Sequence, residues 1–168
     1  MILLADANIL FDFGWVEEGL RHLNSLGPLE VLESVRNEIQ EPDILQVLQD
    51  LQVTFVPLED EWTADLREAK RGGLSLPDAT CLVYARRSGR TVLTSERRLR
   101  ERCQKENVDV HGSLWVVDQL HRQGQCDPAT LCRWLTLWEE QGARLPAAAL
   151  VALRGTLGCQ LPVVGPGA

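Results

Sequence analysis

The sequence predicts an α/β fold in which a central parallel sheet of about five strands is flanked by helices, with more helices at the C-terminus. Two observations predict this fold class. Short apolar runs of buried-strand type alternate along the chain with longer segments of helical periodicity, which is typical of a parallel sheet with helical crossovers. Acidic residues also follow strand-type runs directly, and sites in open α/β sheets form outside the carboxyl ends of strands.

Five segments have the length and composition of short strands. The first is Ile2-Leu3-Leu4-Ala5, and the second covers residues 29–32. The others are expected near residues 52–56, 90–93 and 108–110. Because helical patterns separate these segments, the strands are expected to pair in parallel.

Two helices are expected near the C-terminus, over residues 128–141 and 146–155. Pro128 is placed like a first helical residue behind Asp127, which is a plausible cap. Apolar residues at helical spacing form a stripe on the first of these helices, consisting of Leu131, Trp134, Leu135 and Trp138. The stripe either packs on the domain or serves a dimer or a partner protein.

Two acidic residues directly follow predicted strands. Asp6 ends the first apolar run, where a buried strand has no structural use for a carboxylate. Glu96 follows the strand at residues 90–93 through the turn Thr94-Ser95-Glu96, which leads into a helix from Arg97. Both carboxylates are therefore expected at the carboxyl edge of the sheet.

Two more acidic residues are expected near the same edge. Asp78 follows Pro77 and is expected to open a helix over residues 79–87, with the proline at or just before the first turn. Glu38 lies in a short helical stretch over residues 33–39, after the second strand.

Each carboxylate also has a structural alternative. Asp78 suits a helix cap, because Asp is a preferred N-cap residue. Glu96 suits the first turn of a helix, where acidic side chains are favoured electrostatically. Glu38 suits an exposed surface, and Asp6 suits a turn at the end of a strand.

A cation is required if the four carboxylates lie together, because neighbouring carboxylates raise one another's pKa and resist joint ionisation. Mg²⁺ or Mn²⁺ relieves that repulsion. Such ions prefer oxygen ligands, keep several waters and complete their shell with substrate phosphate. Acids without His or Cys therefore suit phosphate chemistry better than zinc hydrolysis.

Four motifs, in this order along the chain, resemble the PIN domain family. They are Leu4-Ala5-Asp6-Ala7-Asn8-Ile9-Leu10, Glu38, Leu74-Ser75-Leu76-Pro77-Asp78-Ala79 and Leu93-Thr94-Ser95-Glu96-Arg97-Arg98-Leu99. A fifth segment, His111-Gly112-Ser113-Leu114-Trp115, resembles the start of a late PIN helix, so the resemblance covers about residues 1–120. The chain departs from the family at Glu96, where Asp is most common, and in the length of its C-terminal helices.

The resemblance implies a three-layer fold, a Mg²⁺ or Mn²⁺ site and an endoribonuclease that cleaves single-stranded or structured RNA with metal-activated water. Such enzymes are often toxins of bacterial type II toxin-antitoxin pairs, so RNA, a small antitoxin protein and a second copy in a homodimer are the expected partners. The metal-centred and catalytic acids implied are Asp6, Glu38, Asp78 and Glu96. Glu96 is one methylene longer than the usual Asp, so it either reaches the metal, directly or through water, or does not reach it at all. The implied polar supports are Asn8, Thr94 and Ser95.

Composition limits the classes of protein that the chain can belong to. With 168 residues and 45% hydrophobic content it can bury one substantial core. Residues 1–125 are expected to form the PIN-like domain, 126–158 a helical extension packed on it, and 159–168 a disordered tail. Asp6 interrupts the first apolar run too early for a signal peptide, and no stretch approaches the roughly 20 apolar residues of a membrane span.

The five cysteines are odd in number and form no C-x-x-C pair. This pattern predicts reduced thiols in a cytoplasmic protein, with Cys81 in the core. A zinc site at His121, Cys126 and Cys132 is an alternative, although the spacing matches none of the usual structural patterns.

Charge is distributed unevenly, although the net charge is −7. Residues 1–68 carry fifteen acids and three bases, whereas 69–168 carry nine acids and fourteen bases. Arg97 and Arg98, in the first turn after Glu96, are the predicted contacts to the RNA backbone. The alternative is that these arginines only solvate a helix. Trp15 is expected either in the core or as a stacking surface for an unpaired base.

Three functions from different classes fit these observations. The first is the metal-dependent ribonuclease. The second is a catalytically silent module of the same fold that binds RNA or protein. The third is a haloacid-dehalogenase-like phosphatase, which requires an Asp two residues after Asp6, where this chain has Asn8.

Overall fold

The structure is a computed structural model that describes residues 1–160. Within these residues five strands form one sheet, in the order β3-β2-β1-β4-β5, and every neighbouring pair is parallel. The strands are β1 (Leu3–Ala5), β2 (Leu29–Leu32), β3 (Thr54–Val56), β4 (Thr91–Leu93) and β5 (Val110–His111). The predicted α/β fold with a parallel sheet is confirmed.

The last strand differs from the prediction of 108–110, because it covers Val110–His111. The backbone N–H of Val108 donates to the carbonyl of Cys103 at 2.8 Å, which closes the end of the preceding helix. Residue 108 is therefore engaged in a turn, and the ladder with β4 begins later.

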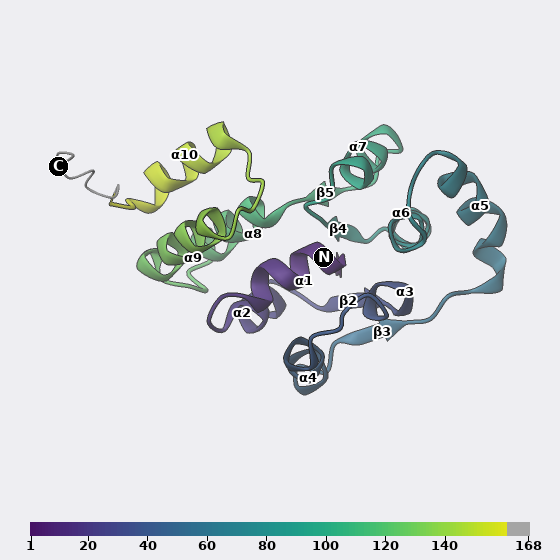
Figure 1. Cartoon of the computed structure of the whole chain (residues 1–168), viewed down its shortest axis with the longest axis horizontal. Helices are drawn as coiled ribbons and strands as arrows, with labels where there is room; N and C mark the ends of the chain where they lie inside the picture. The colour runs from purple at the N-terminus through teal and green to yellow at the C-terminus, as the bar shows by residue number, and fades with distance from the viewer. Residues whose placement is uncertain (161–168) are drawn as a thin grey trace.

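Helices cover both sides of the sheet (Figure 1). Helix α6 packs on β2 and β4, while α8, α9 and α10 gather on the side away from α5 and α6. The helices are α1 (Ala7–Gly14), α2 (Gly19–Ser25), α3 (Glu33–Arg36), α4 (Pro42–Asp50), α5 (Thr63–Arg71), α6 (Leu76–Ser88), α7 (Arg97–Lys105), α8 (Ser113–Arg122), α9 (Pro128–Glu140) and α10 (Ala147–Leu157), with a 3₁₀ turn η1 at Asp60–Trp62. None of the helices described is long and apolar enough to cross a membrane.

Helix α6 begins three residues earlier than predicted, at Leu76. Ser75 is its N-cap, and the Ser75 Oγ accepts a hydrogen bond from the Asp78 N–H at 3.2 Å. A Ser followed three residues later by an acid has the spacing of a capping box. Asp78 therefore lies inside the first turn, and the alternative in which it caps the helix is wrong.

The apolar stripe of α9 is buried inside the chain. Trp134 and Trp138 pack edge-on against Phe13 of α1, with ring centroids 5.9 and 5.2 Å away. The Trp138 indole N–H also donates to the carbonyl of Asp12 at 2.8 Å. Because Trp138 is only 2% exposed, this hydrogen bond satisfies a polar group that water does not reach.

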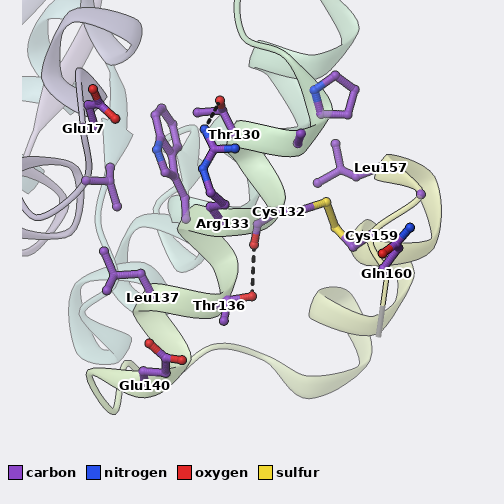
Figure 2. A pocket seen from close by; sticks show the side chains of 15 residues that line it. Glu17, Thr130, Cys132, Arg133, Thr136, Leu137, Glu140, Leu157, Cys159 and Gln160 are labelled. Carbon is purple, nitrogen blue, oxygen red and sulfur yellow. Dashed lines mark hydrogen bonds between the residues drawn. A yellow bond between two sulfur atoms is a disulfide. The ribbon is translucent and has the colours of Figure 1, made fainter. Parts of the chain in front are cut away.

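A disulfide joins Cys132 of α9 to Cys159, just after α10 (Figure 2). The prediction of five reduced thiols is therefore wrong for this pair, because the turn after α10 brings Cys159 against α9. The same bond removes Cys132 from the alternative zinc site. Cys81, Cys103 and Cys126 carry free, buried thiols within the described residues. The remaining part of the predicted tail, residues 161–168, lies outside the described residues.

Candidate active site

The four predicted acids line one hollow of about 340 Å³ at the carboxyl edge of the sheet. They come from four separate segments: the end of β1, the turn after α3, the first turn of α6 and the turn after β4. We call this hollow the acidic pocket. Its lining consists of Asp6, Ala7, Asn8, Phe11, Glu38, Ser75, Asp78 and Glu96.

Asp6 is held in a fixed orientation although it is only 2% exposed. One carboxylate oxygen accepts the N–H of Ala7 at 2.8 Å, and the other accepts the hydroxyl of Thr94 at 2.8 Å. The backbone N–H of Asp6 donates to Leu93 of β4 at 3.0 Å. The ends of β1 and β4 are thus joined, and Asp6 cannot turn out of the pocket without losing these bonds.

Glu96 occupies the N-cap position of α7 but its side chain makes no capping bond. Its backbone N–H donates instead to the Thr94 hydroxyl oxygen at 3.0 Å. Thr94 therefore positions Asp6 and Glu96 together. The Glu96 side chain is half-buried and lines the pocket. Glu96 is therefore not only a solvated residue at the start of a helix, which was its structural alternative.

Asp78 and Glu38 are brought together by packing between α3 and α6. The buried hydroxyls of Ser34 on α3 and Thr80 on α6 are 2.6 Å apart. Glu38 follows α3, where its N–H donates to Val35 at 3.0 Å. Glu38 is exposed, as its alternative predicts, and it nevertheless lines the pocket with Asp78.

The carboxylates disfavour one another's ionisation. Burial raises the pKa of Asp6 from 3.8 to about 6; the Thr94 hydrogen bond opposes that rise, and the charges of Asp78 and Glu38 add to it. Burial also raises the pKa of Asp78, with a further rise from Glu96. The pKa of Glu38 is raised by partial burial and by Asp78. The pKa values of Asp6, Glu38 and Asp78 are therefore each raised in part by a neighbouring carboxylate.

The donor set fits a hard divalent cation. It consists of carboxylate oxygens, which Mg²⁺ and Mn²⁺ prefer, and a cation would offset the repulsion that raises these pKa values. As placed, no three His, Cys, Asp or Glu side chains in residues 1–160 are grouped closely enough to hold a metal ion. An ion here therefore requires bridging waters or a change of side-chain rotamer, and Mg²⁺ characteristically retains several waters.

The comparison with protein families decides the relationship, because the PIN domain family matches residues 3–157. This chain belongs to the PIN domain family. No curated protein sequence matches it. A solved structure with a similar fold is PAE2754 from Pyrobaculum aerophilum, at 18% identity and a TM-score of 0.50, over 72% of this chain and 90% of that one. PIN domains are typically nucleases that use divalent metals, so the fold and the acidic pocket point to the same chemistry.

The predicted supporting residues of this PIN domain do not all lie in the acidic pocket. Asn8 lines the acidic pocket, and Thr94 stands behind Asp6. Ser95 does not line it. The Ser95 hydroxyl donates to Asp12 at 3.1 Å and faces a neighbouring groove, because the turn after β4 points successive side chains in different directions.

Arg97 and Arg98, predicted to act together, line two different hollows. Arg97 lines the groove beside Ser95, whereas Arg98 lies with Gly72, Gly73 and Leu74 on another side of α7. Adjacent residues on a helix are about 100° apart, so neighbours in sequence rarely face one surface. Trp15 is 63% exposed, which rules out its alternative place in the core.

The sequence patterns do not single out two polar residues, one in the acidic pocket and one beside it. Ser75 lines the acidic pocket, and its three-residue spacing from Asp78 is the signal that reveals it. Asp12 accepts hydrogen bonds from Ser95 and Ser113, and burial raises its pKa. Asp12 lies one helical turn after Asn8, which places both on one face of α1, but its partner Ser113 lies too far along the chain for a local motif to show.

Proposed function

We propose that this PIN domain is a Mg²⁺- or Mn²⁺-dependent endoribonuclease that cleaves single-stranded or structured RNA. The observation that carries the proposal is the convergence of four carboxylates from separate segments on one pocket at the carboxyl edge of the sheet. Structural roles account for only part of the group: Asp6 caps α1 through the Ala7 N–H, although burial raises its pKa, whereas Asp78 leaves the capping role to Ser75.

Asp6, Asp78 and Glu38 would hold the ion, and Glu96 would reach it directly or through water. When bound, the ion supplies a Lewis acid and lowers the pKa of a water that attacks phosphorus in line. Thr94 keeps Asp6 oriented toward the pocket. Asn8 is exposed on the first turn of α1 and can donate its amide hydrogens to a phosphate oxygen.

The biological setting that we propose is the toxin of a bacterial type II pair, with a small antitoxin protein that covers the acidic pocket. A basic side chain is the complement that such a pocket requires, because it would neutralise the carboxylates as the metal does. The second candidate function is a silent binding module. It is favoured by one observation, the absence of a ready metal-ligand group in residues 1–160.

The test is cleavage of a mixed-sequence single-stranded RNA by the wild-type protein and Asp78→Asn, in Mg²⁺, in Mn²⁺ and in EDTA. We expect metal-dependent cleavage by the wild type and a loss of about a thousandfold in the variant, since the metal supplies several kcal/mol of barrier reduction. The matched control is Asp43→Asn, which removes an exposed carboxylate from α4. Binding of RNA without metal-dependent cleavage would favour the silent module, and turnover of a phosphomonoester would favour the phosphatase.

A further inference from the structure

A second hollow, of about 490 Å³, is lined by residues of α7, α8 and the start of α10, together with the turn after β4. We call it the arginine groove, after the three arginines in its lining. Its lining includes Arg97, Arg100, Arg144, His111 and Trp115, and one acid, Glu101. The loop before α10 supplies Arg144, so the C-terminal segment completes a surface that the sheet and α7 begin.

Two of the arginines are available for a ligand. Arg97 pairs with Glu101 at 2.7 Å, but Arg100 and Arg144 form no salt bridge with any acid in residues 1–160. Gly112 explains how Arg100 is accommodated, because a Cβ on that residue would stand 2.9 Å from the Arg100 guanidinium. The glycine therefore allows the guanidinium to lie against the chain before α8.

The groove also contains two flat rings that are already aligned. The imidazole of His111 and the indole of Trp115 are stacked, with centroids 4.0 Å apart and planes within 9°. Both rings are partly exposed in the lining of the groove. A planar ligand can continue this stack without reordering either side chain, which lowers the entropic cost of binding it.

The arginine groove and the acidic pocket adjoin at the turn after β4. Ser95 lines the groove and its neighbour Glu96 lines the pocket. Ser95 is fixed by its hydrogen bond to Asp12, which also accepts from Ser113 at the start of α8. A chain molecule can therefore pass from one hollow to the other across a turn whose hydrogen bonds hold it in place.

We propose that the arginine groove binds the RNA strand on one side of the cleaved phosphate. Arg100 and Arg144 contact backbone phosphates, and the His111–Trp115 stack supports one unpaired base. The choice of RNA rests on the proposed function. Arginines alone would suit an acidic protein segment equally well, but guanidinium groups together with an exposed ring stack are typical of surfaces for single-stranded nucleic acid.

The experiment measures binding separately from cleavage. A labelled single-stranded RNA of mixed sequence is titrated by fluorescence anisotropy, at several salt concentrations, with the Asp78→Asn protein as parent. Arg100→Gln/Arg144→Gln in that background should weaken binding and flatten its salt dependence by about 1.4 in log–log slope, since each phosphate contact on a single strand contributes about 0.7. The matched control is Arg21→Gln/Arg122→Gln, which makes the same change of net charge at two exposed arginines elsewhere.

The base platform is tested with Trp115→Leu, which keeps apolar volume but removes the flat ring. We expect about tenfold weaker RNA binding, because stacking of one base on an aromatic ring contributes about that much affinity. Trp115→Phe, which restores a flat ring, should recover the affinity.

Equal affinity and slope in the groove and control variants would overturn the proposal, as would a parent that does not bind RNA. Cleavage by the wild type is read independently. Arg100→Gln/Arg144→Gln is therefore also made in the wild-type background, and metal-dependent cleavage by that protein with unchanged KM would rule out the groove and leave the proposed ribonuclease unaffected. If the groove variant instead abolished binding to a protein partner while RNA affinity stayed constant, the occupant would be protein.

Discussion

The acidic pocket and the arginine groove lie on either side of one turn, yet they are built in opposite ways. In the pocket, the buried Asp6 is fixed by a backbone N–H and a buried hydroxyl at the end of the sheet. In the groove, long side chains stand on helices and a loop, and Arg97 is 87% exposed. Chemistry at a metal tolerates little displacement, whereas backbone binding adapts to many sequences. We infer that the residues at the edge of the sheet determine the reaction, whereas the C-terminal segment determines contact with the substrate.

The largest expected effect concerns the segment that completes the groove. The disulfide between Cys132 and Cys159 closes a loop with a separation of 27 residues, which corresponds to about 3.5 kcal/mol of restricted unfolded-chain entropy. Cys132→Ser/Cys159→Ser should therefore lower the free energy of unfolding by up to about that amount. Urea denaturation with and without a reductant measures it.

The disulfide variant also tests whether the acidic pocket and the arginine groove have separate roles. Because α10 packs on α8 and α9 and carries part of the groove, its loosening should raise KM for RNA and leave kcat nearly unchanged. The wild type in reductant should behave like the double variant. A fall in kcat at constant KM would show that the C-terminal segment supports the pocket instead, and would contradict the division of roles.

The next effect tests the electrostatic cost of the pocket. The folded state raises the pKa of Asp6 to about 6 from 3.8, so folding is penalised when this group must be ionised. Well below pH 3.8 both states carry the proton and no penalty exists. Above about pH 6 both are ionised, and the penalty reaches about 3 kcal/mol.

Asp6→Asn should therefore be more stable than the wild type at pH 7 and nearly equal to it at pH 4. Urea denaturation in EDTA at pH 4, 5 and 7 gives the difference in free energy, with the exposed Asp43→Asn as control. Mg²⁺ should reduce the difference in free energy of unfolding between the two proteins, because it stabilises only the wild type. A variant that is less stable than the wild type at pH 7 would mean that Asp6 stabilises the folded state. Ionised Asp6 would then impose no free-energy penalty on folding.

The sequence supports prediction of the pocket far better than of the groove. Asp6 and Glu96 are predictable because strand ends are local features, and a parallel sheet gathers such ends by topology. The Asp12–Ser113 contact spans 101 residues, and no local pattern signals it. The side chains of Arg97 and Arg98 face different hollows because of the rotation of α7 about its axis, which depends on packing. The pairing of Cys159 likewise depends on how α10 returns over α9.

The smallest expected effect is at Thr94, which joins the acids to the turn shared with the groove. Its buried hydroxyl donates to Asp6 and accepts the N–H of Glu96. Thr94→Val keeps the shape but removes both bonds, so we expect about a tenfold lower kcat/KM, as for residues that orient metal ligands. Since this hydrogen bond lowers the pKa of Asp6, its loss should also move the acidic limb of the pH–rate profile to higher pH. Thr94→Ser, which retains the hydroxyl, should restore both rate and profile. RNA affinity of the groove should stay constant in all three proteins, and a parallel loss of affinity would mean that the turn couples the two regions.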